Sequence, residues 1–298
     1  MLALGANAKQ KVQNTPAQQL IERLQTLQKR GVMFGHQDAL FYGTTWKWEF
    51  GRSDVNDVCG DYPAVLGCEL GGLELGNDKN LDGVPFDKMR QQIIAHHQKG
   101  GIVTISWHPY NPVTGKYAWN TEGDAVTAVL PGGKESAKMQ LWHQRLADFM
   151  ASLKDDKGRA VPVIFRPWHE MSGAWFWWGS KQCTPEQYKA LFRLTFDAMA
   201  QAGLRNLVWS YSPNAQANDT PEHYFLFYPG DSYVDVLGID LYQYNGSAVF
   251  IEQCQNEMRI MSEYAKSHNK LYALTEAGYR NTPDAQWYST ALLPAIKG

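Results

Sequence analysis

Two glutamates lie in segments whose composition suits proton transfer. Glu170 is the only carboxylate within residues 166–179, a stretch that holds four of the chain's eleven tryptophans, and Glu276 lies in a short polar run after a strand-like segment. Aromatic surroundings disfavour the charged form of a carboxyl group, and a neighbouring carboxylate disfavours it further. Two carboxylates flanking one bond are the usual apparatus of glycoside hydrolysis. The alternative is a glutamate paired with an arginine such as Arg166.

The two glutamates belong to a recurring pattern of short apolar runs that alternate with amphipathic stretches. The apolar runs cover residues 32–35, 64–68, 101–107, 161–166, 206–211, 234–241 and 271–275. The helical stretches cover residues 17–30, 86–99, 136–153, 185–202 and 248–267. This alternation predicts a parallel sheet with helices outside it, and its length favours an α/β fold of the (β/α)₈ TIM barrel type.

The last part of the chain does not complete such a barrel. Residues 283–296 have a helical pattern, and no eighth apolar run follows them. Either the barrel is open at this seam, or the sequence is a fragment that lacks its C-terminal part. We therefore expect one catalytic domain over residues 9–298, C-terminally incomplete and with the eighth strand missing.

Each apolar run is followed by residues whose side chains could take part in a reaction or bind a ligand. These residues include His36, Glu69, His108, Glu170, Ser210, Asp240, Tyr242 and Glu276. In barrels of parallel strands the active site forms at the C-terminal ends of the strands. A single residue of this kind could be a helix cap, but a polar or aromatic residue after all seven runs predicts a site at this rim.

The tryptophans and histidines suit the same rim. Sugar rings have apolar faces that stack on aromatic rings, so we expect one or two of the four tryptophans in residues 166–179 to touch substrate and the others to lie in the core. His36, His108 and His169 lie on different strands and show no HExxH or HxH spacing. Hydrogen bonding by these histidines is therefore favoured over metal binding, and we predict neither a metal nor a cofactor.

Several segments together resemble a known family. VIFRPWHEMSGAWFWWG and LTEAG, with MFGHQDALFYG, CELGG, ISWHP, VWSYSPN and VLGIDLYQ, are similar to glycoside hydrolase family 26 over nearly the whole chain. The resemblance implies a (β/α)₈ β-mannanase with a retaining mechanism. It implies that Glu170 is the general acid/base and that Glu276 is the nucleophile.

The resemblance also implies roles for residues near the two glutamates. His169 would tune and orient the acid, Tyr242 would donate a hydrogen bond to the nucleophile, and Trp175 would stack in the site near the acid.

The other implied roles concern residues farther along the rim. His108 and Trp287 would line the subsite of the sugar that is attacked, and Arg166, Glu69 and His36 would support the carboxylates from below or beside them.

The function implied is a retaining endo-β-1,4-mannanase acting on mannan, galactomannan or glucomannan. The partner would be a β-mannan polysaccharide or a manno-oligosaccharide. The alternatives are a retaining hydrolase of mixed-linkage β-glucan or β-1,3-xylan, and an exo-enzyme that releases mannobiose. A non-catalytic carbohydrate-binding protein is disfavoured because both glutamates are present.

The composition and the ends of the chain bear on its partners, its location and its disulfide bridges. A net charge of −2 without a basic block argues against nucleic acid as a partner, and no apolar stretch is long enough for a membrane span. We expect a monomer. Residues 1–8 resemble the end of a secretory signal, which indicates a secreted or periplasmic protein, although an ordinary terminus would look similar. Cys59 and Cys68 could form a disulfide bridge or remain free.

Overall fold

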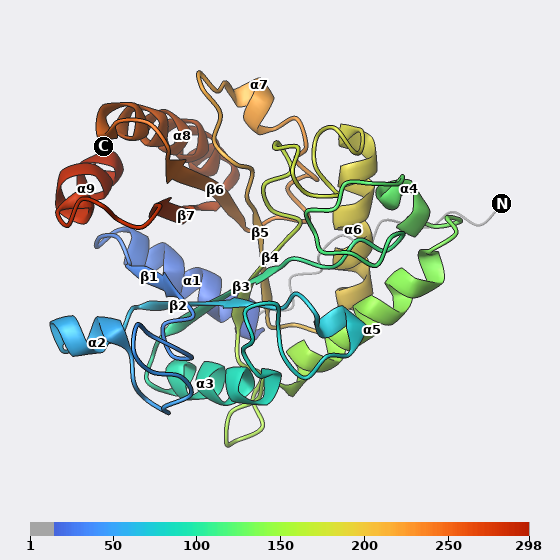
Figure 1. The fold of residues 1–298 in the computed structure, drawn as a ribbon, viewed down its shortest axis with the longest axis horizontal. Coiled ribbons are helices and arrows are strands. Elements are labelled where there is room, and N and C mark those ends of the chain that lie inside the picture. Colours follow the sequence, from blue (N-terminus) through green and yellow to red (C-terminus); the bar gives the residue numbers. More distant parts are fainter. Residues whose placement is uncertain (1–14, 298) are drawn as a thin grey trace.

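A computed structural model describes residues 15–297. The predicted remnant of a secretory signal at residues 1–8 lies outside the described residues. Seven parallel strands form one curled sheet with the strand order β1-β2-β3-β4-β5-β6-β7 (Figure 1). The strands are β1 Gly35–Gln37, β2 Val65–Glu69, β3 Ile102–Trp107, β4 Val163–Pro167, β5 Leu207–Tyr211, β6 Val236–Gln243 and β7 Leu271–Tyr279. The sequential order confirms the predicted barrel type, and within residues 15–297 no eighth strand follows β7.

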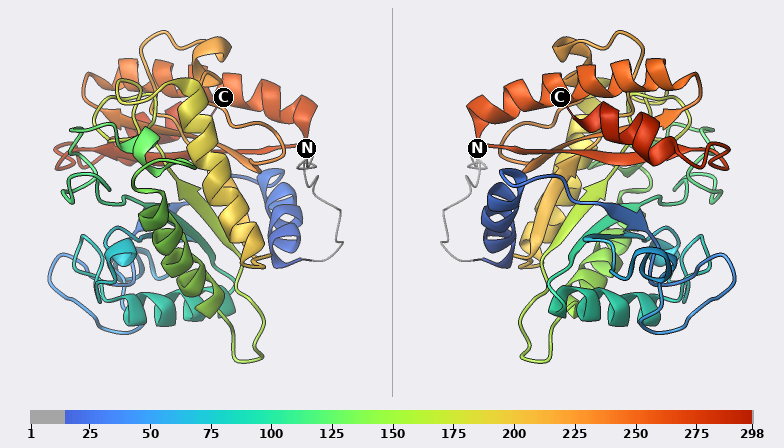
Figure 2. Two further views of the ribbon diagram at one scale, coloured as in Figure 1. Left: turned by 90° about the vertical axis from the view of Figure 1, so that its right-hand side faces the viewer. Right: turned by 90° about the vertical axis from the view of Figure 1, so that its left-hand side faces the viewer.

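Helices cover the outer side of the curled sheet (Figures 1 and 2). The α-helices are α1 Pro16–Gln28, α2 Asp54–Cys59, α3 Phe86–Gln98, α4 Ala125–Val129, α5 Ser136–Ser152, α6 Pro185–Gln201, α7 Pro221–Tyr224, α8 Ser247–His268 and α9 Leu293–Ile296. A 3₁₀ turn, η1, spans Leu73–Leu75, and a π-helical turn, η2, spans Tyr288–Leu292. None of the described helices is long and apolar enough to cross a lipid bilayer.

The start of α6 shows how the sequence sets a helix boundary. Thr184 accepts a hydrogen bond from the backbone N–H of Gln187, the Gln187 side chain accepts one from the backbone N–H of Thr184, and Pro185 occupies the first helical position. This capping box satisfies backbone groups that the helix itself leaves unpaired. Helix α6 therefore begins where the sequence predicts.

Helix α1 covers the end of the sheet at which the strands begin. Leu20 and Leu24 of α1 form one cluster with apolar residues at or next to the first positions of four strands. Those residues are Ile102, Val208, Val236 and Leu271. Because this end is filled by apolar packing, the polar residues at the opposite, C-terminal ends of the strands are left to form a site.

Strands β6 and β7 pair with one irregularity that matters for the site. Ile239 pairs with Leu274 but Asp240 pairs with Glu276, so Thr275 is an extra residue on β7. The Thr275 hydroxyl donates a hydrogen bond of 2.7 Å to Oδ1 of Asp240. Such a bulge changes the face of the sheet on which the following side chains lie. Glu276 thereby lies beside Asp240.

The four cysteines are free in the structure. Cys59 is exposed on α2 and Cys68 is buried in β2. Of the two alternatives for this pair, free thiols are the one observed.

Candidate active site

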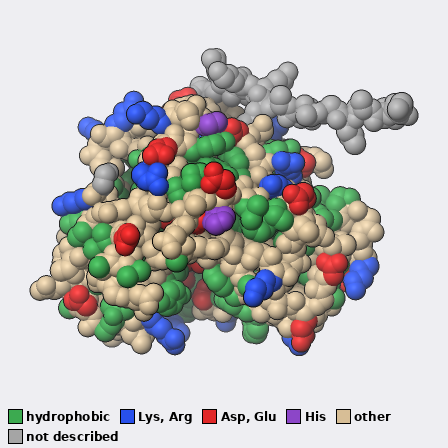
Figure 3. Space-filling view, turned by 90° about the horizontal axis from the view of Figure 1, so that it is seen from above, with side chains coloured by type: hydrophobic (Ala, Val, Ile, Leu, Met, Phe, Trp, Pro, Cys, Tyr) green, Lys and Arg blue, Asp and Glu red, His purple; other side chains and the backbone are tan. Residues whose placement is uncertain are grey.

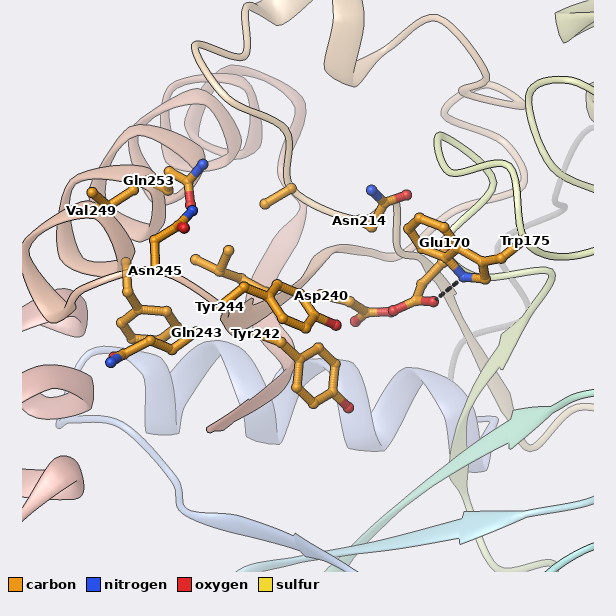
Figure 4. Close-up of a pocket in the computed structure, with 13 residues that line it drawn as sticks. Glu170, Trp175, Asn214, Asp240, Tyr242, Gln243, Tyr244, Asn245, Val249 and Gln253 are labelled. Carbon is orange, nitrogen blue, oxygen red and sulfur yellow. Dashed lines mark hydrogen bonds between the residues drawn. The ribbon is translucent and has the colours of Figure 1, made fainter. Parts of the chain in front are cut away.

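Three carboxylates meet at the C-terminal ends of the strands. Glu170 follows β4, whereas Asp240 lies in β6 and Glu276 in β7, and one oxygen of each lies within 4.8 Å of the other two. Glu170 and Asp240 also line a pocket of about 270 Å³ (Figure 4). On the face seen in Figure 3, acidic and histidine side chains lie close together among hydrophobic ones. The structure thus brings together the two glutamates that the sequence pairs.

Glu170 is held in a conformation that few residues other than glycine adopt. Its φ is +58°, and its backbone N–H donates a 2.7 Å hydrogen bond to the carbonyl oxygen of Ser212. Its Oε2 accepts a 2.7 Å hydrogen bond from the indole N–H of Trp175. Burial, and then the charge of Glu276, raise the pKa of Glu170 above its ordinary value. Glu170 therefore favours the protonated form that a general acid requires.

Glu276 has partners that favour the opposite protonation state. Burial alone would raise its pKa, but the guanidinium of Arg166 and the hydroxyl of Tyr242 outweigh that effect and lower the pKa below its ordinary value. Arg166 Nη2 donates to Oε1 of Glu276, and the Tyr242 hydroxyl donates to Oε2 over 2.6 Å. Glu276 is thus suited to act as a carboxylate.

Asp240, which the sequence places at the rim without a particular role, is a third carboxyl group of the site. Arg166 is buried and extends Nη1 to Oδ2 of Asp240 at 2.7 Å while its Nη2 reaches Glu276. Burial raises the pKa of Asp240 well above its ordinary value. The available signal was the position of this acid inside a run of apolar residues at the end of the sixth predicted strand.

His108 and His169 belong to a series of polar contacts that begins at Glu69 and ends near Glu276. His108 Nδ1 lies 2.7 Å from Oε2 of the buried Glu69, and its Nε2 lies 2.9 Å from Nε2 of His169. His169 Nε2 is 4.0 Å from Oε1 of Glu276. His169 therefore faces the predicted nucleophile with its ring, although it precedes the predicted acid in the sequence.

The protonation states of the two histidines differ. Burial opposes the charge of His108, but the attraction of Glu69 outweighs it and raises the pKa of His108. Burial, followed by the repulsion of Arg166, lowers the pKa of His169 well below its ordinary value. His169 is thus neutral, and His108 is the histidine of the pair that favours a proton.

The tryptophans of residues 166–179 divide as expected between core and surface. Trp168, Trp177 and Trp178 are fully buried, whereas Trp175 is 41% exposed beside Glu170. A second exposed ring, Trp119, stacks on His108 with a centroid distance of 5.5 Å and an interplanar angle of 17°. The sequence did not single out Trp119, which lies in a long loop without a strand-end position to mark it.

Two predicted site residues lie apart from the carboxylates. His36 is exposed on β1 and lines a different pocket, of about 360 Å³. Trp287 is only 2% exposed, and its indole N–H donates a 2.8 Å hydrogen bond to Oε1 of Gln243, which lines the pocket beside Glu170. Its ring packs against Phe250 of α8, so it lies behind the pocket wall.

The three carboxylates are close enough to share a cation. Their oxygens already have other partners, however: Arg166 binds Asp240 and Glu276, Trp175 donates to Glu170, and Tyr242 donates to Glu276. Positive charge in the cluster is therefore supplied by a guanidinium. The arrangement can hold one carboxyl group protonated and another ionised across a small gap, which is the requirement for acid and nucleophile roles.

Comparisons with known proteins agree on one family. Residues 8–291 match the profile of glycosyl hydrolase family 26. The chain is 35% identical over 271 residues to a mannan endo-1,4-beta-mannosidase of Bifidobacterium adolescentis. The aligned region covers 87% of this chain and 26% of that protein. It is 30% identical over 222 residues to a protein of the same name from Bacillus subtilis, covering 71% of this chain and 58% of that protein.

A solved structure extends the comparison to the fold. The GH26 beta-mannanase BoMan26A of Bacteroides ovatus superposes with a TM-score of 0.92 at 42% identity, covering 95% of this chain and 82% of that chain. The chain spans about a quarter of the length of the Bifidobacterium relative and somewhat more than half of the Bacillus one. On the extent of the profile match and of these similarities, the chain belongs to glycosyl hydrolase family 26.

Proposed function

We propose that this chain is a retaining endo-β-1,4-mannanase in which Glu276 is the nucleophile and Glu170 is the general acid/base. The observation that carries the proposal is the pairing of Glu170 and Glu276, whose oxygens lie within 4.8 Å of each other and whose pKa values shift in opposite directions. Retaining enzymes hold the two carboxyl groups about 5–5.5 Å apart, whereas inverting enzymes need a wider gap for a water molecule.

In the first step a carboxylate oxygen of Glu276 attacks the anomeric carbon of the sugar. The bond from that carbon to the glycosidic oxygen breaks, and Glu170 transfers its proton to the departing oxygen. The product is a glycosyl ester of Glu276. Glu170 is left ionised, and the hydrogen bond from Trp175 stabilises the new negative charge.

In the second step the ionised Glu170 takes a proton from water while the water oxygen attacks the anomeric carbon. The ester bond to Glu276 breaks and releases the carboxylate, which Arg166 and Tyr242 stabilise through their hydrogen bonds. Two displacements at one carbon restore the original anomeric configuration.

The substrate class rests on the relatives and on the exposed aromatic rings. The Bifidobacterium and Bacillus relatives are named mannan endo-1,4-beta-mannosidases, and mannan, galactomannan and glucomannan are the polymers that we propose for this chain. Trp175 and Trp119 supply flat faces at the rim on which sugar rings can stack. A polymer of this size must be hydrolysed outside the cytosol, so a secreted or periplasmic location of the protein is part of the proposal.

The test is a product profile on linear mannan, carob galactomannan and barley β-glucan, with the anomeric configuration of the first products followed by NMR. We expect a ladder of manno-oligosaccharides in the β configuration from the two mannans. Mannobiose as the sole early product would indicate exo action, and α products would contradict the retaining mechanism. Cleavage of β-glucan without cleavage of mannan would overturn the proposed substrate.

A further inference from the structure

Trp177 donates two hydrogen bonds to the loop of residues 108–124, which joins β3 to α4. Its indole N–H donates to the carbonyl oxygen of Pro109 over 3.0 Å, and its backbone N–H donates to that of Ala118 over 3.1 Å. Trp177 lies between β4 and α6, in the segment that also carries the proposed acid. One buried residue therefore joins the acid's segment to the neighbouring loop at two separate points.

The two acceptors flank a pair of stacked rings. Pro109 directly follows His108, and Ala118 directly precedes Trp119. The rings of His108 and Trp119 stack with a centroid distance of 5.5 Å and an interplanar angle of 17°. His108 is also held by Glu69, which contacts its backbone N–H at 2.8 Å and its Nδ1 at 2.7 Å. Trp119 is 51% exposed, so its placement depends on the loop that carries it.

Resting on the function proposed above, we propose that Trp177 is a positioning residue that holds the ring of Trp119 in a fixed place relative to the two catalytic carboxyl groups. Trp177 is fully buried and cannot contact a substrate itself. It acts through Trp119, whose exposed face is open for stacking on a sugar ring. A binding group that is already in place loses less conformational entropy when the ligand arrives.

The ring of Trp177 is itself held rigidly. It packs edge-to-face against Trp168 at 5.2 Å and against Trp178 at 5.3 Å, and both neighbours are fully buried. Trp168 donates its indole N–H to Oγ1 of Thr195 over 3.0 Å, and Trp178 donates its own to the carbonyl oxygen of His169 over 2.8 Å. Because packing and hydrogen bonds fix these rings, Trp177 gives the loop a stable point of attachment.

The loop can pass this restraint on because it is cross-linked within itself. The side chain of Asn111 is fully buried and bonds to four backbone groups of the loop. Its Nδ2 donates to the carbonyl oxygens of Asn120 and Glu122, and its Oδ1 accepts from the N–H groups of Val113 and Thr114. A bond to the first part of the loop therefore also restrains the part that contains the exposed tryptophan.

The experiment removes the indole N–H of Trp177. Trp177→Phe removes it together with part of the ring, whereas benzothienylalanine inserted at position 177 has sulfur in place of the N–H and keeps the size of the ring, so that folding is retained. Trp46→Phe is the matched control. Trp46 is also buried, and its indole N–H donates over 2.6 Å to Oδ1 of Asp54, outside the loop of residues 108–124. KM, kcat and the melting temperature are measured, with mannohexaose as substrate.

We expect KM to rise about two- to tenfold in both Trp177 variants, which is the range that one hydrogen bond typically contributes. The change in kcat should be less than about twofold, because stacking on Trp119 stabilises the bound substrate and the transition state alike. The pH limits of activity should stay in place, since Glu69 holds His108 independently. Trp46→Phe should lower the melting temperature to a similar extent and leave KM unchanged.

A double-mutant cycle with Trp119→Ala separates positioning from a general loss of stability. Trp119→Ala alone should raise KM, and Trp177→Phe should then add little, because it acts through the ring that is already missing. Additive effects on KM, or an unchanged KM in both Trp177 variants, would overturn the inference. Failure of the unmodified protein to cleave mannohexaose or mannan would instead contradict the proposed function itself.

Discussion

The indole N–H of Trp175 donates a hydrogen bond of 2.7 Å to Oε2 of Glu170. This contact joins the half-exposed ring at the rim to the carboxyl group that we propose as acid and base. A hydrogen bond to a carboxylate favours its ionised form, so it partly offsets the effect of burial on the pKa of Glu170. Trp175 therefore has two expected roles: the face of its ring is open for stacking, and its indole N–H influences the acidity of Glu170.

Replacing Trp175 by Phe should keep an aromatic ring and remove this hydrogen bond. The pKa of Glu170 should rise further, because the ionised form loses a donor. We expect the alkaline limb of the pH profile of kcat/KM to move to higher pH, with a loss of about tenfold in kcat on poor leaving groups because the developing carboxylate is less stabilised. An unmoved alkaline limb would show that Trp175 does not set the acidity of Glu170.

The acidic limb should report Glu276. Its pKa lies below the ordinary value because Arg166 and Tyr242 outweigh burial, so activity should persist to acidic pH and fall as Glu276 takes up a proton. Tyr242→Phe removes a donor from the carboxylate and should move this limb to higher pH. The alkaline limb, which belongs to Glu170, serves as the internal reference and should move much less.

Substituting Glu276 by Ala should lower kcat by several orders of magnitude, because no ester can form. Azide should restore part of the activity with an activated aryl mannoside and give a glycosyl azide of inverted configuration. In Glu170→Ala, activated substrates should still form the ester and give a burst, since they need no acid. Near-normal activity of Glu276→Ala, or equal effects of Glu170→Ala on good and poor leaving groups, would contradict the respective assignment.

Arg166 should be important for stability as well as for the charge of Glu276. Arg166→Met leaves the carboxyl groups of Asp240 and Glu276 without their shared cation, which typically costs about 3–5 kcal/mol of unfolding free energy. The loss should be smaller in acidic solution, where Glu276, whose pKa Arg166 lowers, takes up a proton. Urea denaturation at two pH values measures both effects, and Arg259→Met, which removes an exposed ion pair on α8, should change stability little.

A buried acid outside the site should make stability depend on pH. Burial, and then the charge of Asp219, raise the pKa of Glu257 to about 9. Because the folded state binds this proton more tightly than the unfolded chain does, stability should fall as the pH rises from about 4.5 toward 9. Glu257→Gln should therefore be more stable than the unmodified protein at pH 8, by about 1 kcal/mol or more, with little difference at pH 4. Denaturation curves that differ equally at both pH values would contradict this assignment.

The strands and their order could be predicted because apolar runs and helical periodicity recur through the chain. The first strand is an instructive difference: residues 32–35 are apolar, but pairing with β2 begins at Gly35 and extends to Gln37. Hydrophobicity marked the segment, whereas the hydrogen-bonding register, which depends on β2, set its ends. Short helices such as α2, α4 and α7 were missed because four to six residues carry too little periodicity to be seen.

The proposed catalytic pair could be predicted from residue type and position at strand ends, and the structure places Glu170 and Glu276 close together. The partners of these residues could not be assigned by the same means. His169 is next to Glu170 in sequence, yet its ring faces Glu276, because Trp168 and Glu170 both have positive φ and the backbone turns sharply between them. Trp287 was expected at a sugar, but burial against Phe250 depends on packing that a single sequence does not reveal.

The extra residue in β7 has a consequence for how this chain can change. If Thr275 took a regular place opposite Asp240, Glu276 would pair with Leu241, and its side chain would turn from the barrel mouth toward the helices outside the sheet. A change in β7 that removed the bulge but kept all of its residues would then retain both glutamates and still move the proposed nucleophile away from the site. For this part of the chain, the bulge between Leu274 and Glu276 is as strict a requirement as the identity of the glutamate, so insertion of one residue into the regular ladder after the bulge should be excluded here while substitutions at nearby exposed positions are tolerated.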